Sequence, residues 1–338
     1  MTQPQPPSAL LGQTPTVKRS VIALSEGSDP RVVAGAITAR AAGLADLILV
    51  GVQADVEAEL HALGTASGPG LTVHDPRTSP FREEFASAFH ELRQHKGVTP
   101  EAAAKAVQDP LIYAAMLVRL GHAAGTVGGA VATTSDVVRT ALQVIGKAPD
   151  ASMVSSFFLM YPPENPTADG RAMLYSDCGL VIDPNVDELV AIAAASAKSC
   201  KQLLRQDPKL AMLSFSTKGS AKHPTVSKVT LATEALHRTH PELNVDGELQ
   251  FDAAYSPEIG DRKSPGSAVA GRANVMIFPN LDAGNIAYKI TQRQGGYSAI
   301  GPILQGLAQP ANDLSRGCTS EDVLEMIAVT VLQASQSS

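Results

Sequence analysis

The chain has 338 residues, a formal net charge of −6 and a hydrophobic content of 44%. This length and composition predict a folded protein with a sizeable core, divided into about two domains. Charged residues make up only 18% of the chain, which argues against disorder and a coiled coil, and the acidic balance makes nucleic acid a poor candidate partner.

The first 150 residues alternate short apolar runs with segments that have helical spacing. Residues 1–18 are rich in Pro, Gln and Thr, and we expect them to form a flexible tail. The apolar runs predict strands at 21–24, 47–50 and 71–73. Helices are predicted at 30–43, 55–63, 82–95, 100–107, 110–122 and, after the glycine-rich segment 125–129, at 135–145.

A second series of elements begins near residue 153. Strands are predicted at 155–160, 173–176, 211–215 and 275–278, and helices at 187–204, 226–237 and 284–292. An apolar segment at 299–304, a loop at 309–319 and a helix at 321–333 close the chain. This alternation predicts an α/β fold with mainly parallel sheets and helices on both faces, and the composition break at residues 147–150 predicts a domain boundary.

Several common motifs are missing from the sequence. There is no GxxxxGK[ST], no GxGxxG after the first strand, no HExxH and no GxSxG, so a P-loop kinase, a zincin or an α/β-hydrolase is a poor interpretation. The three cysteines, Cys178, Cys200 and Cys318, lack the spacing of a zinc site. Without a signal-peptide pattern or a long apolar run, the sequence predicts reduced thiols in a cytoplasmic protein with no membrane association.

A loop near the C-terminus carries the densest set of reactive side chains, within Asn312–Asp322. A loop that leads into a helix offers free N–H groups to an anion. Arg316 suits a phosphate or a developing oxyanion, and Ser315 can donate to a polarised carbonyl oxygen. Asp322 has two interpretations, a proton acceptor or the second member of a capping box with Thr319. Cys318 has no visible histidine partner, which favours a packing role over a nucleophile.

Three other segments have ordinary structural interpretations as well as functional ones. Thr134 or Ser135 can cap the helix that carries Arg139. Arg93 lies in a segment typical of a solvated helix end. The turn Pro279–Asn285 follows a strand and opens a helix, which a helix cap explains without any function.

Together these segments form a recognisable set, because Glu91–Pro100, Tyr175–Cys178, Ser216–Ser220, Pro279–Lys289 and Asn312–Gly317 occur in one order. With them the sequence resembles the phosphate acetyltransferase (phosphotransacetylase) family from about Val21 to the last helix. The Asn-Asp-Leu-Ser-Arg-Gly loop and the Pro-x-Leu-x-x-Gly-Asn-x-x-Tyr-Lys turn are specific as a pair.

The resemblance implies a two-domain fold like that of isocitrate and isopropylmalate dehydrogenases, with mainly parallel sheets and a cleft between the domains. Residues 19–150 and 303–338 would form the first, discontinuous α/β domain. Residues 151–302 would form the second domain and the dimerisation surface of a homodimer.

The implied activity is the reversible transfer of an acetyl group between acetyl phosphate and coenzyme A (CoA), a step of acetate metabolism. The CoA thiolate would attack acetyl phosphate directly in a ternary complex. CoA is then a substrate, no cofactor is bound permanently, and no metal is needed because arginines can neutralise the phosphoryl group.

The resemblance also assigns roles to individual residues. Asp322 matches the base toward the CoA thiol, Ser315 the residue that hydrogen-bonds the transition state, and Arg316 the arginine beside the thiol and phosphoryl groups. Arg93 and Arg139 match arginines associated with CoA, and Ser135 is a further candidate for binding CoA or the other substrate.

Other functions stay open on the sequence alone. A phosphate butyryltransferase or another phosphate acyltransferase would differ only in the volume of its acyl pocket. A non-catalytic module that senses acetyl-CoA is an alternative of another class, although Ser315, Arg316 and Asp322 are all present. A decarboxylating dehydrogenase would need a set of metal-binding acids and a nucleotide loop that the sequence does not reveal.

Overall fold

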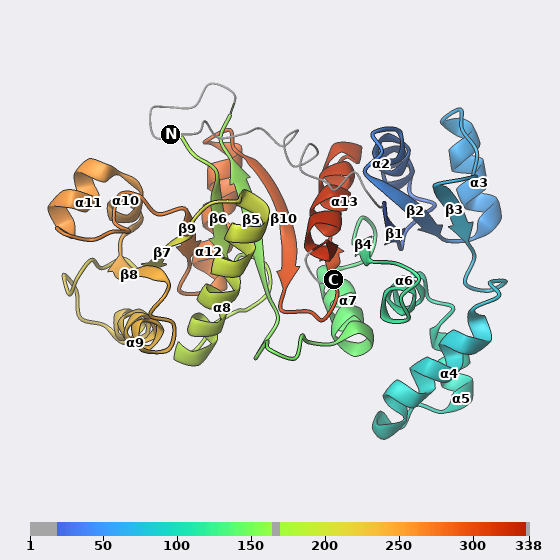
Figure 1. Ribbon diagram of the computed structural model, residues 1–338, viewed down its shortest axis with the longest axis horizontal. Helices are drawn as coiled ribbons and strands as arrows, with labels where there is room; N and C mark the ends of the chain where they lie inside the picture. The colour runs from blue at the N-terminus through green and yellow to red at the C-terminus, as the bar shows by residue number, and fades with distance from the viewer. Residues whose placement is uncertain (1–18, 164–169, 336–338) are drawn as a thin grey trace. The chain divides into compact units, whose positions relative to one another are not determined.

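The computed structural model describes residues 19–163 and 170–335, so the predicted flexible tail lies outside the described residues (Figure 1). The chain divides into two compact units. We name the two units by their place in the sequence. The central unit is Asp150–Gly306, and the outer unit combines the flanking residues 19–149 and 307–335.

The outer unit is built on an all-parallel sheet in the order β11-β4-β1-β2-β3. Its strands are β1 (Ser20–Leu24), β2 (Ala45–Val50), β3 (Leu71–His74), β4 (Gly125–Gly128) and β11 (Ala311–Asp313). The inner strands are short and almost entirely apolar because helices cover both faces of the sheet.

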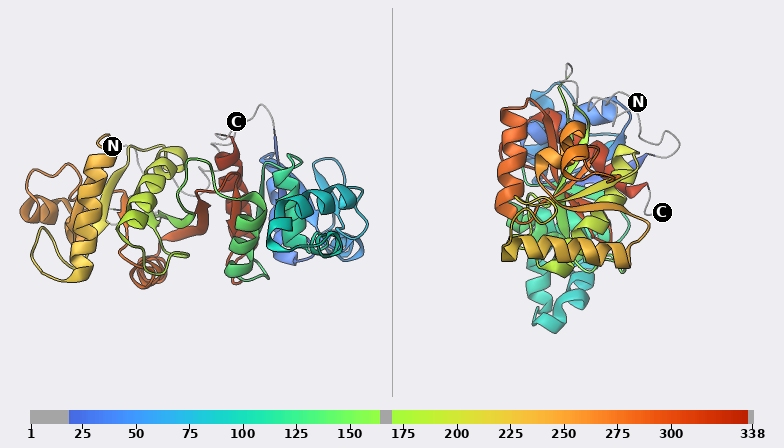
Figure 2. Two further views of the ribbon diagram at one scale, coloured as in Figure 1. Left: turned by 90° about the horizontal axis from the view of Figure 1, so that it is seen from below. Right: turned by 90° about the vertical axis from the view of Figure 1, so that its left-hand side faces the viewer.

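The helices of the outer unit form two groups (Figure 1). On one face lie α2 (Pro30–Ala41), α3 (Gln53–Ala62) and α13 (Ser320–Ala334). On the other face lie α6 (Pro110–Arg119) and α7 (Thr134–Thr140), which a π-helical turn (Ala141–Ile145) continues. Two more helices, α4 (Arg82–Arg93) and α5 (Pro100–Ala106), pack on each other and extend away from the sheet, where they are cyan in Figures 1 and 2. A short 3₁₀ turn, Gln94–Lys96, ends α4.

One hydrophobic cluster fixes α4, α5 and α6 on this sheet. It includes Ala23, Ile48 and Val50 of the strands together with side chains of the helices, among them Phe85, Phe89, Ala103, Tyr113, Met116 and Leu117. All of these side chains are less than a tenth exposed. Burial of such side chains stabilises the fold by about 1.5–3 kcal/mol each for the larger ones.

The central unit is built on a mixed sheet in the order β10-β5-β6-β9-β7-β8. Its strands are β5 (Ser155–Tyr161), β6 (Met173–Ser176), β7 (Lys209–Leu213), β8 (Asn244–Leu249), β9 (Val275–Ile277) and β10 (Ser298–Gln305). The strand β5 runs antiparallel to both β10 and β6, and the remaining pairs are parallel.

Helices cover this sheet too. They are α8 (Val186–Ser199) with the π-helical turn Cys200–Leu204, α9 (Pro224–Thr239), α10 (Phe251–Tyr255), α11 (Pro257–Lys263) and α12 (Leu281–Arg293). Phe158, Met160, Tyr175 and Met276 pack toward α10 and α12 in one hydrophobic cluster. Helix α8 packs against β6 and β9, whereas α9 packs against β7 and β8.

The predicted α/β alternation is present, but the strands β4, β8 and β11 and the helices α10 and α11 were not predicted. The strand β8 was not predicted, because Asn-Val-Asp-Gly-Glu-Leu has two acidic residues and a glycine. The strand β11 lies in a segment predicted as loop, and β10 extends the predicted apolar segment to Gln305. The chain consequently leaves the central unit only after Gly306.

Candidate active site

The loop from β11 to α13 has a buried first half and an exposed second half. Asn312, Asp313 and Leu314 are buried, whereas Ser315 and Arg316 are exposed. Asn312 Nδ2 donates to the side chains of Thr330 and Gln333 on α13 at 2.9 and 2.7 Å. The Leu314 N–H donates to the Gly128 carbonyl at 2.6 Å, which joins the loop to the end of β4. The loop therefore presents Ser315 and Arg316 from a fixed base.

The first turn of α13 contains Asp322 in a capping box. Thr319 Oγ1 accepts from the Asp322 N–H at 3.2 Å, and Asp322 Oδ2 accepts from the Thr319 N–H at 2.7 Å. The capping interpretation of Asp322 is thus confirmed. Both capping contacts to the carboxylate, from the Thr319 N–H and the Thr319 hydroxyl, use Oδ2, and no hydrogen bond from the described residues reaches Oδ1. That oxygen is available to accept a proton, so capping and general-base roles are compatible.

Arg31 binds backbone carbonyl groups of the loop between β11 and α13, and no motif in the sequence identifies it. Its Nη1 donates to the carbonyls of Arg316 at 2.8 Å and Cys318 at 3.2 Å. Its Nη2 donates to the Ala130 carbonyl at 2.8 Å, and the guanidinium forms a bidentate ion pair with Asp29. The hydrogen bonds from Arg31 hold the pKa of Asp29 below its ordinary value. Arg31 thus joins two loops of the site to the start of α2.

Glu26 organises the segment that precedes α7. Its carboxylate accepts from the N–H groups of Ala130 at 2.6 Å, Val131 at 3.0 Å and Ala132 at 2.7 Å. Three convergent donors fix the course of the chain between β4 and α7. An isolated glutamate after the first strand carries no sequence signal for this role.

Helix α7 carries two of the predicted binding residues. The N-cap is Thr133, whose Oγ1 accepts from the Asp136 N–H at 3.2 Å, and not Thr134 or Ser135 as predicted. The Thr134 side chain is used elsewhere, in a hydrogen bond to Asp313. Ser135 is exposed, and Arg139 forms an exposed ion pair with Asp136. The start of α7 and the Ser315–Arg316 loop are therefore neighbours within the outer unit.

Arg93 lies apart from these residues in the hydrogen-bond network. It is the last residue of α4, half-buried, and it forms no ion pair with any residue that the structure describes. No hydrogen bond connects it to the Ser315–Arg316 loop or to α7 within residues 19–163 and 170–335. Its role in binding CoA stays a prediction.

The thiol of Cys318 is poorly placed for nucleophilic attack. Its side chain is only 5% exposed, and burial raises the pKa of the thiol, against the effect of Arg31. All three cysteines are free and buried. A reactive thiol needs a lowered pKa and access, so the structure favours the packing role.

Two of the recognised motifs meet in the central unit. Asn280 caps α12 by accepting from the Ala283 N–H at 3.0 Å, as the cap interpretation predicted. Gly284 lets α12 approach the 176–178 segment, because a Cβ there would lie 2.4 Å from the Asp177 carbonyl oxygen. Asn285 Nδ2 donates to the Cys178 carbonyl at 3.1 Å. The specific spacing of the Pro279–Lys289 turn thus serves close packing.

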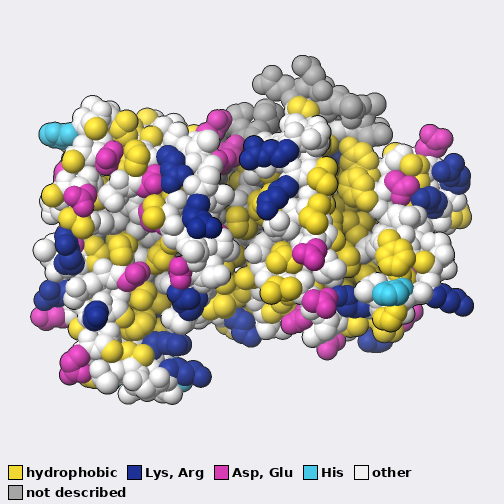
Figure 3. Space-filling model, turned by 180° about the vertical axis from the view of Figure 1, so that it is seen from behind, with side chains coloured by type: hydrophobic (Ala, Val, Ile, Leu, Met, Phe, Trp, Pro, Cys, Tyr) yellow, Lys and Arg dark blue, Asp and Glu magenta, His cyan; other side chains and the backbone are white. Residues whose placement is uncertain are grey.

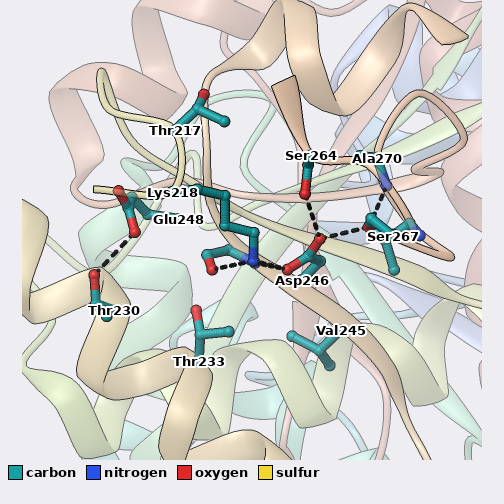
Figure 4. A network of polar contacts seen from close by, with 12 residues as sticks. Thr217, Lys218, Thr230, Thr233, Val245, Asp246, Glu248, Ser264, Ser267 and Ala270 are labelled. Atoms are coloured by element: carbon teal, nitrogen blue, oxygen red, sulfur yellow. Dashed lines mark hydrogen bonds and ion pairs between the residues drawn. The ribbon is translucent and has the colours of Figure 1, made fainter. Parts of the chain in front are cut away.

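A third motif, Ser216–Ser220, holds the acidic residues of β8 (Figure 4). Lys218 pairs with Asp246, which Ser264 and Ser267 also contact. Burial raises the pKa of Asp246, but the contacts with Lys218 and Ser267 outweigh it and hold this pKa below the ordinary value. Glu248 accepts from the Ser216 hydroxyl at 2.8 Å. These contacts explain how an edge strand with two carboxylates is stable.

Charged side chains of both signs lie scattered over the face drawn in Figure 3. On the face drawn in Figure 3, basic and acidic side chains alternate with hydrophobic ones, without one extended basic area among the coloured side chains. Among residues 19–163 and 170–335, no group of three or more His, Cys, Asp or Glu side chains is arranged to hold a metal ion. None of the helices in these ranges is long and apolar enough to span a bilayer.

The fold and the Ser-Arg loop define an α/β protein of the two-unit class that includes the phosphotransacetylases. The phosphotransacetylase from Streptococcus pyogenes superposes with a TM-score of 0.90, at 43% identity, over 97% of this chain and 98% of its own. The 4-hydroxythreonine-4-phosphate dehydrogenase from Klebsiella pneumoniae shares only the fold, with a TM-score of 0.54 at 12% identity over 95% of this chain and 99% of its own.

Sequence comparison identifies the family within this class. The phosphate acetyltransferase of Paracoccus denitrificans is 49% identical over 314 residues, which cover 92% of this chain and 94% of its own length. The family model described as phosphate acetyl/butaryl transferase matches residues 11–331. The chain belongs to this phosphate acetyl/butaryl transferase family.

Proposed function

We propose that the protein is a phosphate acetyltransferase, which converts acetyl-CoA and phosphate reversibly into CoA and acetyl phosphate. The observation that carries the proposal is the exposed Ser315–Arg316 pair on the loop that leads into α13, whose first turn carries Asp322 with Oδ1 unengaged. Family membership and relatives named phosphate acetyltransferase support it.

In the proposed reaction the CoA thiolate attacks the carbonyl carbon of acetyl phosphate in a ternary complex. The new carbon–sulfur bond forms as the bond from this carbon to the phosphate oxygen breaks, and phosphate leaves with the bonding electrons. Asp322 Oδ1 accepts the thiol proton, and Ser315 donates to the carbonyl oxygen as negative charge develops there.

A carboxylate is a weak base for a thiol with a pKa near 8.5. Positive potential must therefore favour the thiolate in the proposed mechanism. The Arg316 guanidinium and the free N–H groups at the start of α13 would supply it, and Arg316 would also neutralise the phosphoryl group. Arg139 and Ser135 at the start of α7, together with Arg93, would bind CoA.

The site described above is built from the outer unit alone, and the predicted cleft between two domains stays a prediction. We also propose a homodimer formed through the central unit, since α12 exposes Ile286 and Ile290, one turn apart, at 57% and 56%. The free cysteines support a reducing, cytoplasmic environment.

The activity assay separates the alternatives. Purified protein is mixed with CoA and either acetyl phosphate or butyryl phosphate, and thioester absorbance is followed. We expect thioester from acetyl phosphate at a rate at least about tenfold above that from butyryl phosphate, because the two extra methylenes of the butyryl group would not fit a pocket sized for acetyl. The reverse preference would indicate a butyryltransferase, and thioester from neither would contradict both transferase functions in favour of a binding module.

A further inference from the structure

The carboxyl group of Asp313 is buried where two loops of the candidate site meet, and no proposed chemical step uses it. Asp313 ends β11, two residues before Ser315, and its side chain is fully buried. Oδ2 accepts from Thr134 Oγ1 at 2.6 Å. Oδ1 is also buried, and no described residue donates to it. A buried polar atom without a partner is unfavourable by about 1–3 kcal/mol, so its presence needs a physical reason.

Gly129 makes room for this carboxyl group. Its φ is +101°, and a Cβ at this position would lie 2.1 Å from Asp313 Oδ1 and 2.7 Å from the Leu314 carbonyl oxygen. No side chain other than hydrogen fits there. Gly129, which follows β4, therefore packs directly against the Asp313 carboxyl group and the Leu314 backbone at the end of β11.

Asp313 connects the two halves of the proposed site, one through its hydrogen bond to Thr134 and the other through the chain itself. Thr134 is the first residue of α7, the helix that carries Ser135 and Arg139. In the other direction, Leu314 leads directly to Ser315 and Arg316. A displaced Asp313 would change the spacing between the residues proposed to bind CoA and those proposed to stabilise the transition state.

Among residues 19–163 and 170–335, no basic side chain forms an ion pair with Asp313. Glu26, on the loop after β1, repels a negative charge there. Arg31 of α2 pairs with Asp29, Arg139 of α7 pairs with Asp136, and α13 contributes the acidic residues Asp322 and Glu325. Arg316, three residues along the loop, is exposed and does not contribute to the pKa of Asp313. Burial first, and Glu26 in addition, raise the pKa of Asp313 to about 7, against the hydrogen bond from Thr134. The group thus changes charge in the neutral range.

We propose that Asp313 is a positioning residue for the transfer reaction, which sets the start of α7 against the Ser315–Arg316 loop and does so best in its neutral form. This inference rests on the proposed function. Ionised Asp313 adds a second negative charge beside Glu26, close to the loops proposed to bind the anionic substrates. Ionisation therefore weakens the binding of acetyl phosphate and CoA.

The test compares Asp313→Asn, which keeps the acceptor oxygen and cannot ionise, with Thr134→Val, which removes the hydroxyl group at constant shape. Asp55→Asn, an exposed carboxylate on α3, is the matched control. KM and kcat are measured for both substrates from pH 6 to 9. The ratio of wild-type KM to variant KM at each pH removes the titration of the substrates themselves.

For Asp313→Asn we expect this KM ratio to rise about three- to tenfold between pH 6 and 8.5, with kcat within about threefold of wild type. Thr134→Val should raise the KM for CoA about tenfold, because the hydrogen bond that holds the start of α7 to Asp313 is lost. It should also move the inflection in the plot of KM against pH to higher pH than in the wild type. The hydrogen bond from Thr134 lowers the pKa of Asp313, so its removal raises this pKa. The Asp55→Asn ratio should stay at one.

A flat KM ratio for Asp313→Asn, with an active wild-type enzyme, would overturn the inference. If Asp313→Asn does not fold, as judged by circular dichroism, an unmoved inflection in Thr134→Val would overturn it equally. If the wild-type protein shows no turnover, the proposed function fails on its own. Calorimetric titration of CoA into the wild type and Asp313→Asn at pH 6, 7 and 8 then decides the inference, since only a pH-dependent difference in Kd supports it.

Discussion

Arg31 Nη1 lies 2.8 Å from the backbone carbonyl oxygen of Arg316, so one arginine is positioned by the side chain of another that is 285 residues away in sequence. The contact leaves the Arg316 guanidinium free, because it uses only the main chain. Arg31 thus supports the arginine that is proposed to bind substrate and would not compete with it for an anion.

Arg31→Ala should lower kcat/KM by about 10- to 100-fold, since it removes charged hydrogen bonds to both loops, each of about 1.5–3 kcal/mol. Arg31→Lys should not restore activity, because one ammonium group cannot replace the planar fork. Steady-state kinetics measure the effect, with Arg19→Ala as control. Arg19 forms an ion pair 3.8 Å from Asp46 at the surface, where both side chains are exposed. Equal losses in both alanine variants would contradict the positioning role.

The variants Asp322→Asn and Thr319→Ala distinguish the proposed general-base role of Asp322 from its role in the capping box of α13. Asp322→Asn keeps an oxygen that can accept from the Thr319 N–H, so we expect kcat to fall by about 10²-fold or more with little change in stability. Thr319→Ala should lower the free energy of unfolding by about 1 kcal/mol and leave kcat within about threefold. Turnover and thermal unfolding measure the two effects. Should Thr319→Ala lose as much turnover as Asp322→Asn, the cap alone would explain the importance of Asp322.

In the proposed CoA site, Asp136 would compete with CoA for the guanidinium of Arg139. The two side chains form an exposed ion pair, and hydrogen bonds from Thr133 and Arg139 lower the pKa of Asp136. Asp136→Asn should free the guanidinium and reduce the KM for CoA about threefold, whereas Arg139→Ala should raise it about tenfold. Both effects should diminish at high salt. A KM for CoA that neither substitution changes would remove Arg139 from the CoA site.

Glu325 makes stability depend on pH. It lies one turn after Asp322 on α13, is 8% exposed, and burial followed by the charges of Asp322 and Glu321 raises its pKa from 4.5 to about 8. Between these pH values the unfolded chain is ionised and the folded one is protonated, so unfolding releases a proton and stability falls as pH rises. The full effect is up to about 5 kcal/mol.

Glu325→Gln should therefore stabilise the protein at pH 9 relative to the wild type, and the difference should shrink toward pH 5. Chemical denaturation at several pH values measures this. Glu321→Gln, on the exposed side of the same helix, is the control and should show a much smaller change. A pH-independent difference for Glu325→Gln would mean that Glu325 does not titrate as described.

The proposed dimer surface has a direct test. Ile286→Glu on α12 should shift the oligomeric state to monomer in light scattering coupled to size exclusion, because a charge opposes burial of the surface. Leu231→Glu on α9 is matched in type, as Leu231 is 52% exposed in the same unit. Dissociation by Leu231→Glu alone would place the interface on α9, and a monomeric wild type would exclude the dimer.

Prediction from sequence succeeded where one local rule decided the structure. Apolar runs such as Leu47–Val50 became strands, and Asn280 became a helix cap, because burial on both faces and an unpaired helix terminus leave few alternatives. The exposed pair Ser315 and Arg316 was found through its motif.

The missed features depend on partners distant in sequence. The strand β8 is stable because Lys218 and Ser216 bind its carboxylates, and no local pattern shows these partners. Arg31 and Glu26 act on backbone groups about 100 or more residues away, so their spacing carries no signal. The raised pKa of Asp313 follows from burial and from Glu26, neither of which a motif records.

Because the outer unit is discontinuous in sequence, its last two elements are synthesised after the central unit. The strand β11 and helix α13 belong to the outer unit, yet they follow the entire central unit in sequence. During synthesis from the N-terminus, β4 forms the unpaired edge of its sheet while the central unit is translated, because its partner β11 does not yet exist. Ser315, Arg316 and Asp322 reach their places only after that edge is closed. A ribosome-bound chain that ends before residue 307 would therefore expose an unpaired edge and lack the Ser315–Arg316 loop, so the proposed activity would begin only with the last segment.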